Sequence, residues 1–220
     1  METLRWAWRT FRHRIAASSS FQTQSLPLLH MISRACPEMP VVFLDTGFHF
    51  PETLAFRDEI VAQMGLNLMV ARPEISREVF LRAYGEDIQK RDPDFCCYHN
   101  KVEPMQRALD GMVAWVAGVR KDQTAHRSEF RYLEPLISGV IKLHPLLHWS
   151  AADIEAYRQY YALPEHPLTA LGYLSIGCAP CTVPVFNMDA SGDARAGRWA
   201  GKGKTECGLH IDTPRRSSRA

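Results

Sequence analysis

The stretch Lys204–His210, KTECGLH, sets a cysteine among glycines, with a lysine and a histidine close by. Positive charge near a thiol favours the thiolate, which is the nucleophilic form of cysteine. Glu206 acts in the opposite direction, and the alternative interpretation of Cys207 is a buried structural thiol in a C-terminal turn. Cys207 is therefore a candidate nucleophile, and the rest of the chain is expected to present an electrophile to it.

Four further cysteines form two local pairs, the adjacent Cys96 and Cys97 and the spaced pair Cys178-x-x-Cys181. Adjacent cysteines are poorly placed to form a disulfide with each other, so they serve better as two ligands of one metal centre. Four thiolates suffice for a 4Fe-4S cluster or a tetrahedral zinc ion. The usual zinc signature is two C-x-x-C knuckles, so the side-by-side pair favours iron and sulfur. Cys36, at the end of an amphipathic helix, is expected to be structural.

Short apolar stretches alternate with helical patterns, which predicts a doubly wound, mainly parallel α/β sheet flanked by helices. A helix is expected after Ser76, and Ser150 with Asp153 forms a capping-box-like start to another. The predicted strands are Arg14–Ser18, Val41–Leu44, Leu66–Val70, Met112–Ala117 and Ile137–Leu143.

Polar residues follow three of these strands, at the edge where open α/β sheets bind ligands. A serine-rich loop before a helix (18–25) makes an anion site, because free backbone N–H groups and the helix dipole converge there. A serine-capped helix without a ligand is the alternative. Asp45, Thr46 and Gly47 follow the second strand, and a loop with several arginines (118–131), which is also typical of a solvated loop, follows the fourth.

Composition narrows the function classes. The chain has 220 residues, 46% of them apolar, which fits one domain. A net charge of +2, with basic residues spread along the chain, does not favour nucleic acid as a partner. No apolar run approaches the roughly 18 residues that a membrane span needs. Six cysteines without a secretory signal indicate a reducing compartment, and we expect the cytoplasm. The predicted organisation is a nucleotide-binding domain with the metal site (1–190) and a flexible C-terminal segment that carries Cys207 (191–220).

Taken together, the motifs resemble those of the assimilatory adenylyl-sulfate and phosphoadenylyl-sulfate reductases, which belong to the PP-loop nucleotide-binding superfamily. The resemblance runs over nearly the whole chain, and each motif is short, but their number and order are highly specific. The motifs are SSSF (18–21), LDTG (44–47), FPET (50–53), CC (96–97) with KVEP (101–104), GVRKDQ (118–123), SIGCAPCT (175–182), RAGRW (195–199) and ECGLH (206–210).

The resemblance implies thioredoxin-dependent reduction of adenylyl sulfate to sulfite and AMP, through an S-sulfonate on Cys207. It implies a 4Fe-4S cluster on Cys96, Cys97, Cys178 and Cys181, and thioredoxin or a glutaredoxin-like protein as the reductant. It makes Cys207, Lys101 and His210 catalytic. The substrate-binding residues that it implies are Ser18, Ser19, Ser20, Phe21 and Gln24 for phosphate, Asp45, Thr46 and Gly47 for adenosine, Arg120 and Arg127 in an arginine loop, and Arg195 and Arg198 at the phosphosulfate.

Within that family the cluster cysteines usually accompany use of adenylyl sulfate, so this substrate is predicted, with the 3′-phosphorylated form as the alternative. Gln22 departs from the pattern, because many members have glycine there and glycine allows close approach of the backbone to phosphate. Two other classes stay open: a PP-loop adenylating ligase or sulfurtransferase that uses ATP and magnesium, and a metal-stabilised binding protein in which Cys207 is idle. Whether the protein is a homo-oligomer is also open.

Overall fold

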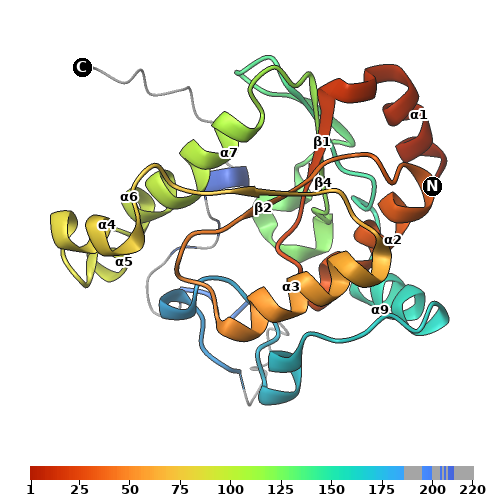
Figure 1. Ribbon diagram of the computed structural model, residues 1–220. Helices are drawn as coiled ribbons and strands as arrows, with labels where there is room; N and C mark the ends of the chain where they lie inside the picture. The colour runs from red at the N-terminus through yellow and green to blue at the C-terminus, as the bar shows by residue number, and fades with distance from the viewer. Residues whose placement is uncertain (186–194, 200–203, 205, 207, 211–220) are drawn as a thin grey trace.

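The structure is a computed structural model that describes residues 1–185, 195–199, 204, 206 and 208–210 (Figure 1). Cys207 and the predicted boundary at residues 190–191 lie outside the described residues. In the described part of the chain, no helix combines the length and apolar character needed to cross a membrane.

One sheet of six strands organises the molecule, in the order β3-β2-β1-β4-β6-β5. All neighbours are parallel except β5, which pairs antiparallel with β6 at the edge. The predicted doubly wound, mainly parallel sheet is thereby confirmed. The strands are β1 Ile15–Ser18, β2 Val41–Leu44, β3 Leu68–Ala71, β4 Ala114–Ala117, β5 Leu133–Pro135 and β6 Ile141–Leu143.

The α-helices are α1 Glu2–Phe11, α2 Leu26–Ala35, α3 Pro51–Met64, α4 Arg77–Tyr84, α5 Ile88–Arg91, α6 Pro93–Cys97, α7 Glu103–Ala108, α8 Ala125–Ser128 and α9 Ala151–Tyr160. The expected starts of α4 and α9 are confirmed, since Ser76 caps Val79 N and Ser150 and Asp153 form the reciprocal capping box. A π-helical segment, Tyr98–Val102, joins α6 to α7. The 3₁₀ turns are Arg12–Arg14, Thr23–Ser25, Lys121–Gln123, Pro167–Leu171, Ala179–Cys181 and Gly208–His210.

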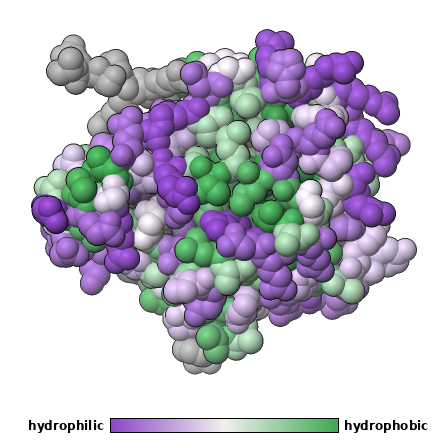
Figure 2. Space-filling model, viewed as in Figure 1, coloured by the Kyte–Doolittle hydropathy of each residue, from purple (hydrophilic) through white to green (hydrophobic). Residues whose placement is uncertain are grey.

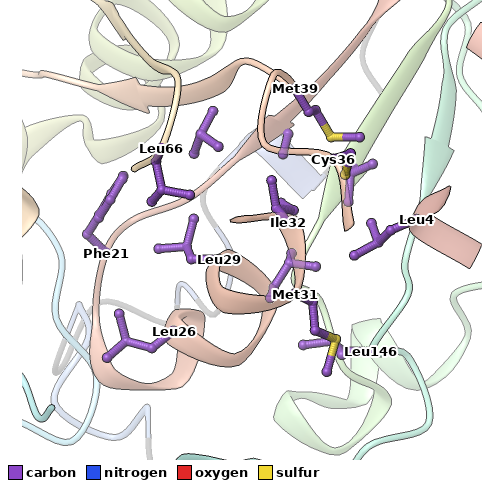
Figure 3. Packing of buried hydrophobic residues seen from close by; sticks show 14 of the residues in the cluster. Leu4, Phe21, Leu26, Leu29, Met31, Ile32, Cys36, Met39, Leu66 and Leu146 are labelled. Atoms are coloured by element: carbon purple, nitrogen blue, oxygen red, sulfur yellow. The ribbon is translucent and has the colours of Figure 1, made fainter. Parts of the chain in front are cut away.

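Alternation along the strands divides the core between the two faces of the sheet. Ile15 and Ala17 face a large apolar cluster that α1, α2, α3 and α9 cover, whereas Ala16 faces a second cluster with α7. Figure 3 shows side chains of α2, among them Leu29 and Ile32, packed in the first cluster. Each such side chain contributes about 1.5–3 kcal/mol on burial. The sheet is thus packed on both faces, and the loops at its edge are left to form a site.

Polar and apolar residues are also separated on the surface of the molecule. Figure 2 shows hydrophilic residues over most of one face, with apolar residues reaching the surface near its middle and again over α4. Val79 and Tyr84 of α4 are among the exposed large apolar side chains.

One predicted strand is wrong in its first half. Residues 136–140 form a turn between β5 and β6, in which Leu136 N donates to Val140 O at 2.9 Å. Gly139 has a φ of 85°, a left-handed conformation that glycine adopts without strain, and Ile137 is 64% exposed. Apolar Ile137 and Val140 thus belong to a hairpin turn and its exit, and the real strand begins at Ile141.

Candidate active site

A cavity of about 860 Å³ opens at the carboxyl ends of the central strands. Its wall includes the loop after β1 (18–20), the end of β2 at Leu44 and the loop after β4 (117–120). The strand order reverses between β1 and β4, because the chain proceeds from β1 to β2 and β3 on one side and places β4 and β6 on the other. Ligand sites of open α/β sheets lie at such a reversal. The predicted serine loop and arginine loop therefore meet in one cavity.

The serine loop is held by a buried aromatic ring at its tip. Phe21 has a φ of 53°, is fully buried and packs edge-on against Phe43 of β2, with ring centroids 5.7 Å apart. Its N–H donates to Ser19 Oγ at 3.0 Å. Phe21 thus anchors the loop from the core and is not part of the cavity wall, while Ser18, Ser19 and Ser20 are.

Two side chains tie this loop to neighbouring elements. Trp115 of β4 donates from Nε1 to Ser18 Oγ at 2.8 Å. Gln22, where the resembled family often has glycine, donates to Ser20 Oγ at 3.0 Å and accepts from Ile176 N at 3.0 Å. The side chain of Gln22 thereby joins the serine loop to the segment before Cys178.

The predicted Arg120 lies in the wall but is already paired. Its guanidinium donates to both carboxylate oxygens of Asp122, at 2.9 and 3.3 Å, and to Gln24 Oε1 at 3.0 Å. Only 3% of the residue is exposed. Asp122 cancels much of the Arg120 charge, so Arg120 fixes the position of Gln24 and contributes little net attraction for an anion.

Arg127 is paired as well, with the residue that precedes Cys207. Its Nε and Nη2 donate to the two carboxylate oxygens of Glu206, both at 2.7 Å, and Thr124 Oγ1 donates to the same carboxylate at 2.9 Å. The side chains of Arg127 and Glu206 are only 6% and 4% exposed. Burial acts to raise the pKa of Glu206, but the hydrogen bonds and charge of Arg127, and the charge of Arg195, hold that pKa below its ordinary value.

Lys101, Arg195 and Arg198 bring further cationic groups to the wall. Among the described residues, the buried Nε of Arg198 has no hydrogen-bond partner, although Nη1 donates to Ile176 O at 3.3 Å. A methyl group on Gly177 would lie 2.2 Å from Arg198 Nη2, so the glycine makes room for this guanidinium. A buried donor without a partner is costly unless a ligand satisfies it. Arg198 is thus the cation best placed to receive an anion.

His210 lines the same cavity and is half-buried. Its Nδ1 lies 3.0 Å from Lys142 Nζ, and its ring is stacked on Trp115 with centroids 6.3 Å apart. Burial first, and then the positive charge of Lys142 and Arg127, keep the pKa of His210 well below the usual histidine value. The imidazole is therefore neutral at physiological pH.

The four paired cysteines line a second, smaller cavity. Cys96 and Cys97 are in α6, and Cys178 and Cys181 are at the start and end of the turn around Ala179. Asp92 caps α6 by accepting from Phe95 N at 2.9 Å, which fixes Cys96 and Cys97. Burial, and then the neighbouring thiols, raise the pKa of Cys96 to about 12. Within the described ranges, no three histidine, cysteine or carboxylate side chains form a group that could hold a metal ion.

Within the LDTG motif, Leu44 lines the large cavity, whereas Thr46 contacts one of the paired cysteines. Thr46 is buried, with its hydroxyl 3.4 Å from Cys178 Sγ. Asp45 accepts from Arg72 Nε at 3.1 Å and from Gly47 N at 3.2 Å, and Gly47 has a φ of 71°. None of Asp45, Thr46 and Gly47 is in the wall of the large cavity. Of the three predicted adenosine contacts, Thr46 thus contacts a cysteine, Asp45 pairs with Arg72, and the role in binding adenosine stays a prediction.

Several residues of the site were not predicted as such. Lys101 and Trp199 line both cavities, and Trp199 was quoted in a motif without a role. Glu206 was interpreted only as a charge opposing the thiolate. Trp115 and Lys142 belong to strands, where an aromatic ring or a lone lysine carries no sequence signal of a site. The members to which the sequence assigns no role are Trp115, Asp122, Lys142, Gly177 and Trp199.

Comparisons with known proteins agree with this arrangement. Residues 14–184 match the family model described as the phosphoadenosine phosphosulfate reductase domain. The chain is 42% identical over 215 residues to the adenosine 5′-phosphosulfate reductase of Streptomyces coelicolor, covering 96% of this chain and 87% of that protein. It is 45% identical over 198 residues to the adenosine 5′-phosphosulfate reductase of Chelativorans sp., covering 90% and 79%. The crystal structure of a phosphoadenylyl-sulfate reductase from Candida auris, a phosphate complex, aligns with a TM-score of 0.73 and 34% identity over 83% of this chain and 89% of that one.

Proposed function

The chain belongs to the phosphoadenosine phosphosulfate reductase family, and we propose that it reduces adenylyl sulfate to sulfite with release of AMP. It is accordingly an oxidoreductase that acts on a sulfated nucleotide. The observation that carries the proposal is the large cavity at the strand reversal, which collects serine hydroxyls on one side and cationic groups on the other. A nucleotide phosphate and a sulfate are the anions that such a wall would bind.

The reaction has two steps in this proposal. The Cys207 thiolate attacks the sulfur of adenylyl sulfate, an S–S bond forms, the S–O bond to the phosphate breaks and AMP leaves with the electron pair. One thiolate of a reduced dithiol protein then attacks Cys207 Sγ, and sulfite departs with the electrons of the S–S bond. The second thiol of the partner resolves the mixed disulfide and releases Cys207. The dithiol is oxidised to a disulfide, and sulfur is reduced from sulfate to sulfite.

The residues of the cavity supply charge and position. Arg198, with its buried Nε unpartnered, would receive the phosphosulfate, and Lys101 and Arg195 line the same region. Donors aimed at the oxygens that gain charge as AMP leaves stabilise the transition state, and removal of one such donor typically costs about 10²–10³ in rate. Cys207 lies outside the described residues, but Glu206 beside it is fixed on Arg127 at 2.7 Å. This contact supports delivery of the nucleophile to the cavity.

A 4Fe-4S cluster on Cys96, Cys97, Cys178 and Cys181 is part of the proposal. The donor set fits, because four thiols line one cavity, Asn100 Nδ2 lies 3.7 Å from Cys96 Sγ and the Thr46 hydroxyl lies 3.4 Å from Cys178 Sγ. The side-by-side pair Cys96–Cys97 departs from the two C-x-x-C knuckles of a typical zinc site, which favours a cluster over a single zinc. When bound, the cluster would supply fixed local charge. Lys101, which lines both cavities, would lie between that charge and the substrate.

Thioredoxin or a glutaredoxin-like protein is proposed as the dithiol partner, because the second step needs a thiolate that can reach a protein-bound sulfonate. A cytoplasmic location is proposed with it, since thiols stay reduced there.

The 3′-phosphorylated nucleotide is the second candidate substrate, because the family description and the Candida auris relative name it. The relatives from Streptomyces coelicolor and Chelativorans sp. favour adenylyl sulfate. Comparing kcat/KM for the two nucleotides at matched ionic strength decides between them. A value at least tenfold higher for the 3′-phosphorylated form would reassign the substrate.

The test of the proposed function is sulfite production from adenylyl sulfate with reduced thioredoxin. Wild type should turn over repeatedly, whereas Cys207→Ser should bind the nucleotide and release no sulfite. Without thioredoxin, wild type should gain the mass of one sulfonate on Cys207, and Cys36→Ser, a matched buried-thiol control, should gain it equally. Repeated turnover by Cys207→Ser would refute the assigned nucleophile.

A further inference from the structure

A buried lysine lies directly behind His210. Lys142 is on β6 and only 2% of it is exposed. Its Nζ lies 4.2 Å from the ring centroid of Trp115 and 5.9 Å from that of Phe130. A buried ammonium is costly unless it is compensated, and here two aromatic faces and hydrogen-bond acceptors provide the compensation. Most lysines lie at the surface, so a buried lysine on the strand next to β4 indicates a specific role.

The contacts of Lys142 define the protonation of His210. The ammonium donates to Leu209 O at 3.2 Å and lies 3.0 Å from His210 Nδ1. An ammonium has three donors and no acceptor, so Nδ1 must accept. In a neutral imidazole the proton is then on Nε2. Nε2 is on the other side of the ring from Lys142, and His210 lines both the large cavity and a neighbouring cavity of about 410 Å³ that Lys142 also lines.

The groups around His210 favour the neutral form. Lys142 faces it from β6, His144 from the residue after β6, Arg127 from α8, and Arg195 from the segment before Trp199. His126 of α8 donates from Nε2 to the carbonyl of His210 at 3.2 Å. The nearby carboxylates are engaged elsewhere, Glu206 with Arg127 and Glu134 with His144 Nε2 at 3.0 Å. The field at the imidazole is thus positive, and it resists a further proton.

We propose that Lys142 is the positioning residue for His210: its ammonium holds the imidazole as the Nε2–H tautomer, so that a neutral donor is offered to the sulfated nucleotide. The same ammonium fixes the carbonyl of Leu209 and with it the turn Gly208–His210, which follows Cys207 directly. The assignment to a sulfated nucleotide rests on the proposed function, whereas the tautomer does not.

The closing experiment measures the tautomer directly. In protein labelled with ¹⁵N at histidine, multiple-bond ¹H–¹⁵N spectra distinguish Nδ1–H, Nε2–H and imidazolium, and the His210 signals are identified by their loss in His210→Gln. Wild type should show the Nε2–H tautomer from pH 6 to 9. Lys142→Met removes the donor while filling the space beside Trp115 and Phe130 with a flexible apolar side chain. It should give a mixture of tautomers that gains a proton near neutral pH.

Activity gives the second readout. Lys142→Met should lower kcat/KM for adenylyl sulfate by roughly tenfold or more and add a new pH dependence near neutrality. Lys142→Gln keeps an N–H donor, so it should retain the Nε2–H tautomer and recover much of the activity. Lys90→Met, an exposed lysine of α5, should match wild type in both readouts.

Two results would overturn the proposal: an Nδ1–H tautomer in wild type, which needs no variant to fold, or an unchanged Nε2–H tautomer in Lys142→Met. If wild type makes no sulfite but shows the lysine-dependent tautomer, the proposed function fails and the positioning role of Lys142 stands. If it makes sulfite while Lys142→Met keeps the wild-type tautomer and pH profile, the positioning role fails alone.

Discussion

Replacing Glu206 by glutamine tests whether the Arg127 contact holds the segment that contains the nucleophile. The carboxylate receives Nε and Nη2 of Arg127, both at 2.7 Å, and the hydroxyl of Thr124 at 2.9 Å, with Arg195 at 3.6 Å. Glu206→Gln keeps the shape and one acceptor oxygen. It removes the negative charge and the second acceptor, and leaves the buried guanidinium of Arg127 uncompensated.

The size of the effect follows from these contacts. A hydrogen bond to a charged group contributes about 1.5–3 kcal/mol, and losing one lowers the population of the seated segment about ten- to a hundredfold. The single-turnover rate of Cys207 sulfonation should fall by that factor if Glu206 seats Cys207 for attack. The rate is measured without reductant, from the intact mass of samples quenched in acid.

Glu155→Gln is the matched control. Glu155 also receives an arginine at 2.7 Å, from Arg158 of the same helix α9, but its side chain is 45% exposed. Exposed pairs contribute about 0.2–1 kcal/mol, so this variant should sulfonate at the wild-type rate. A rate for Glu206→Gln within twofold of wild type would show that Arg127 does not hold the nucleophile segment.

The pH dependence of the same contact has a defined sign. The pKa of Glu206 is held below its ordinary value of 4.5, so its contribution to stability is complete above that value. It is lost as pH falls through the lowered pKa, when the carboxylate is protonated and the ion pair breaks. Glu206→Gln should therefore lose less stability than wild type as pH falls below about 4.5, while Asp87, Asp153 and Glu155 still contribute to the loss.

Three further predictions concern the cavity and the core. Gly177→Ala places a methyl group 2.2 Å from Arg198 Nη2, so it should raise KM for adenylyl sulfate about tenfold or more, and it should add nothing in an Arg198→Ala background. Trp115→Phe removes the 2.8 Å hydrogen bond to Ser18 while keeping an aromatic ring, which should lower kcat/KM about two- to tenfold. His166 accepts from Leu168 N at its Nδ1, and burial lowers its pKa to about 4. The free energy of unfolding measured in urea should therefore fall as pH drops from about 6.5 to 4, with up to about 3 kcal/mol of the fall due to His166. His166→Gln should show a smaller decline, since His49, His144 and His210 still contribute.

The sheet was predictable because its signals are local. Val41–Leu44 is a continuous apolar run that ends at a polar motif, and β2 has those same bounds. The failure at Ile137 came from a turn that only pairing with β5 reveals: residues 133–135 carry charge and proline, so their pattern alone does not indicate a strand. A strand at the edge of a sheet can stay largely exposed. An exposed strand shows little of the alternation between apolar and polar residues by which a strand is identified in a sequence.

The sequence indicated which residues form the site better than it indicated the contacts that these residues make. The spacing of Cys96, Cys97, Cys178 and Cys181 indicated one centre, and the four do line one cavity. Residue type could not show that a carboxylate already occupies the guanidinium of Arg127, nor that Thr46 contacts Cys178. Those contacts depend on which residues, distant in sequence, lie next to each other in the folded chain. Spacing along the sequence indicates which face of a strand or helix a side chain occupies, but not which residue of a distant segment it meets.

Because the arginines are paired with carboxylates, the net positive charge that faces an anionic substrate is smaller than the number of arginines indicates. Asp122 neutralises Arg120, and Glu206 neutralises Arg127 and lies 3.6 Å from Arg195. The positive field in the cavity therefore depends on whether Glu206 is seated. If the segment at Glu206 leaves the wall, two guanidinium groups lose their counter-ion and attract an incoming dianion more strongly. A seated Glu206 competes with an anionic substrate for the same two cations. We therefore expect Glu206→Gln to slow sulfonation while tightening the binding of AMP.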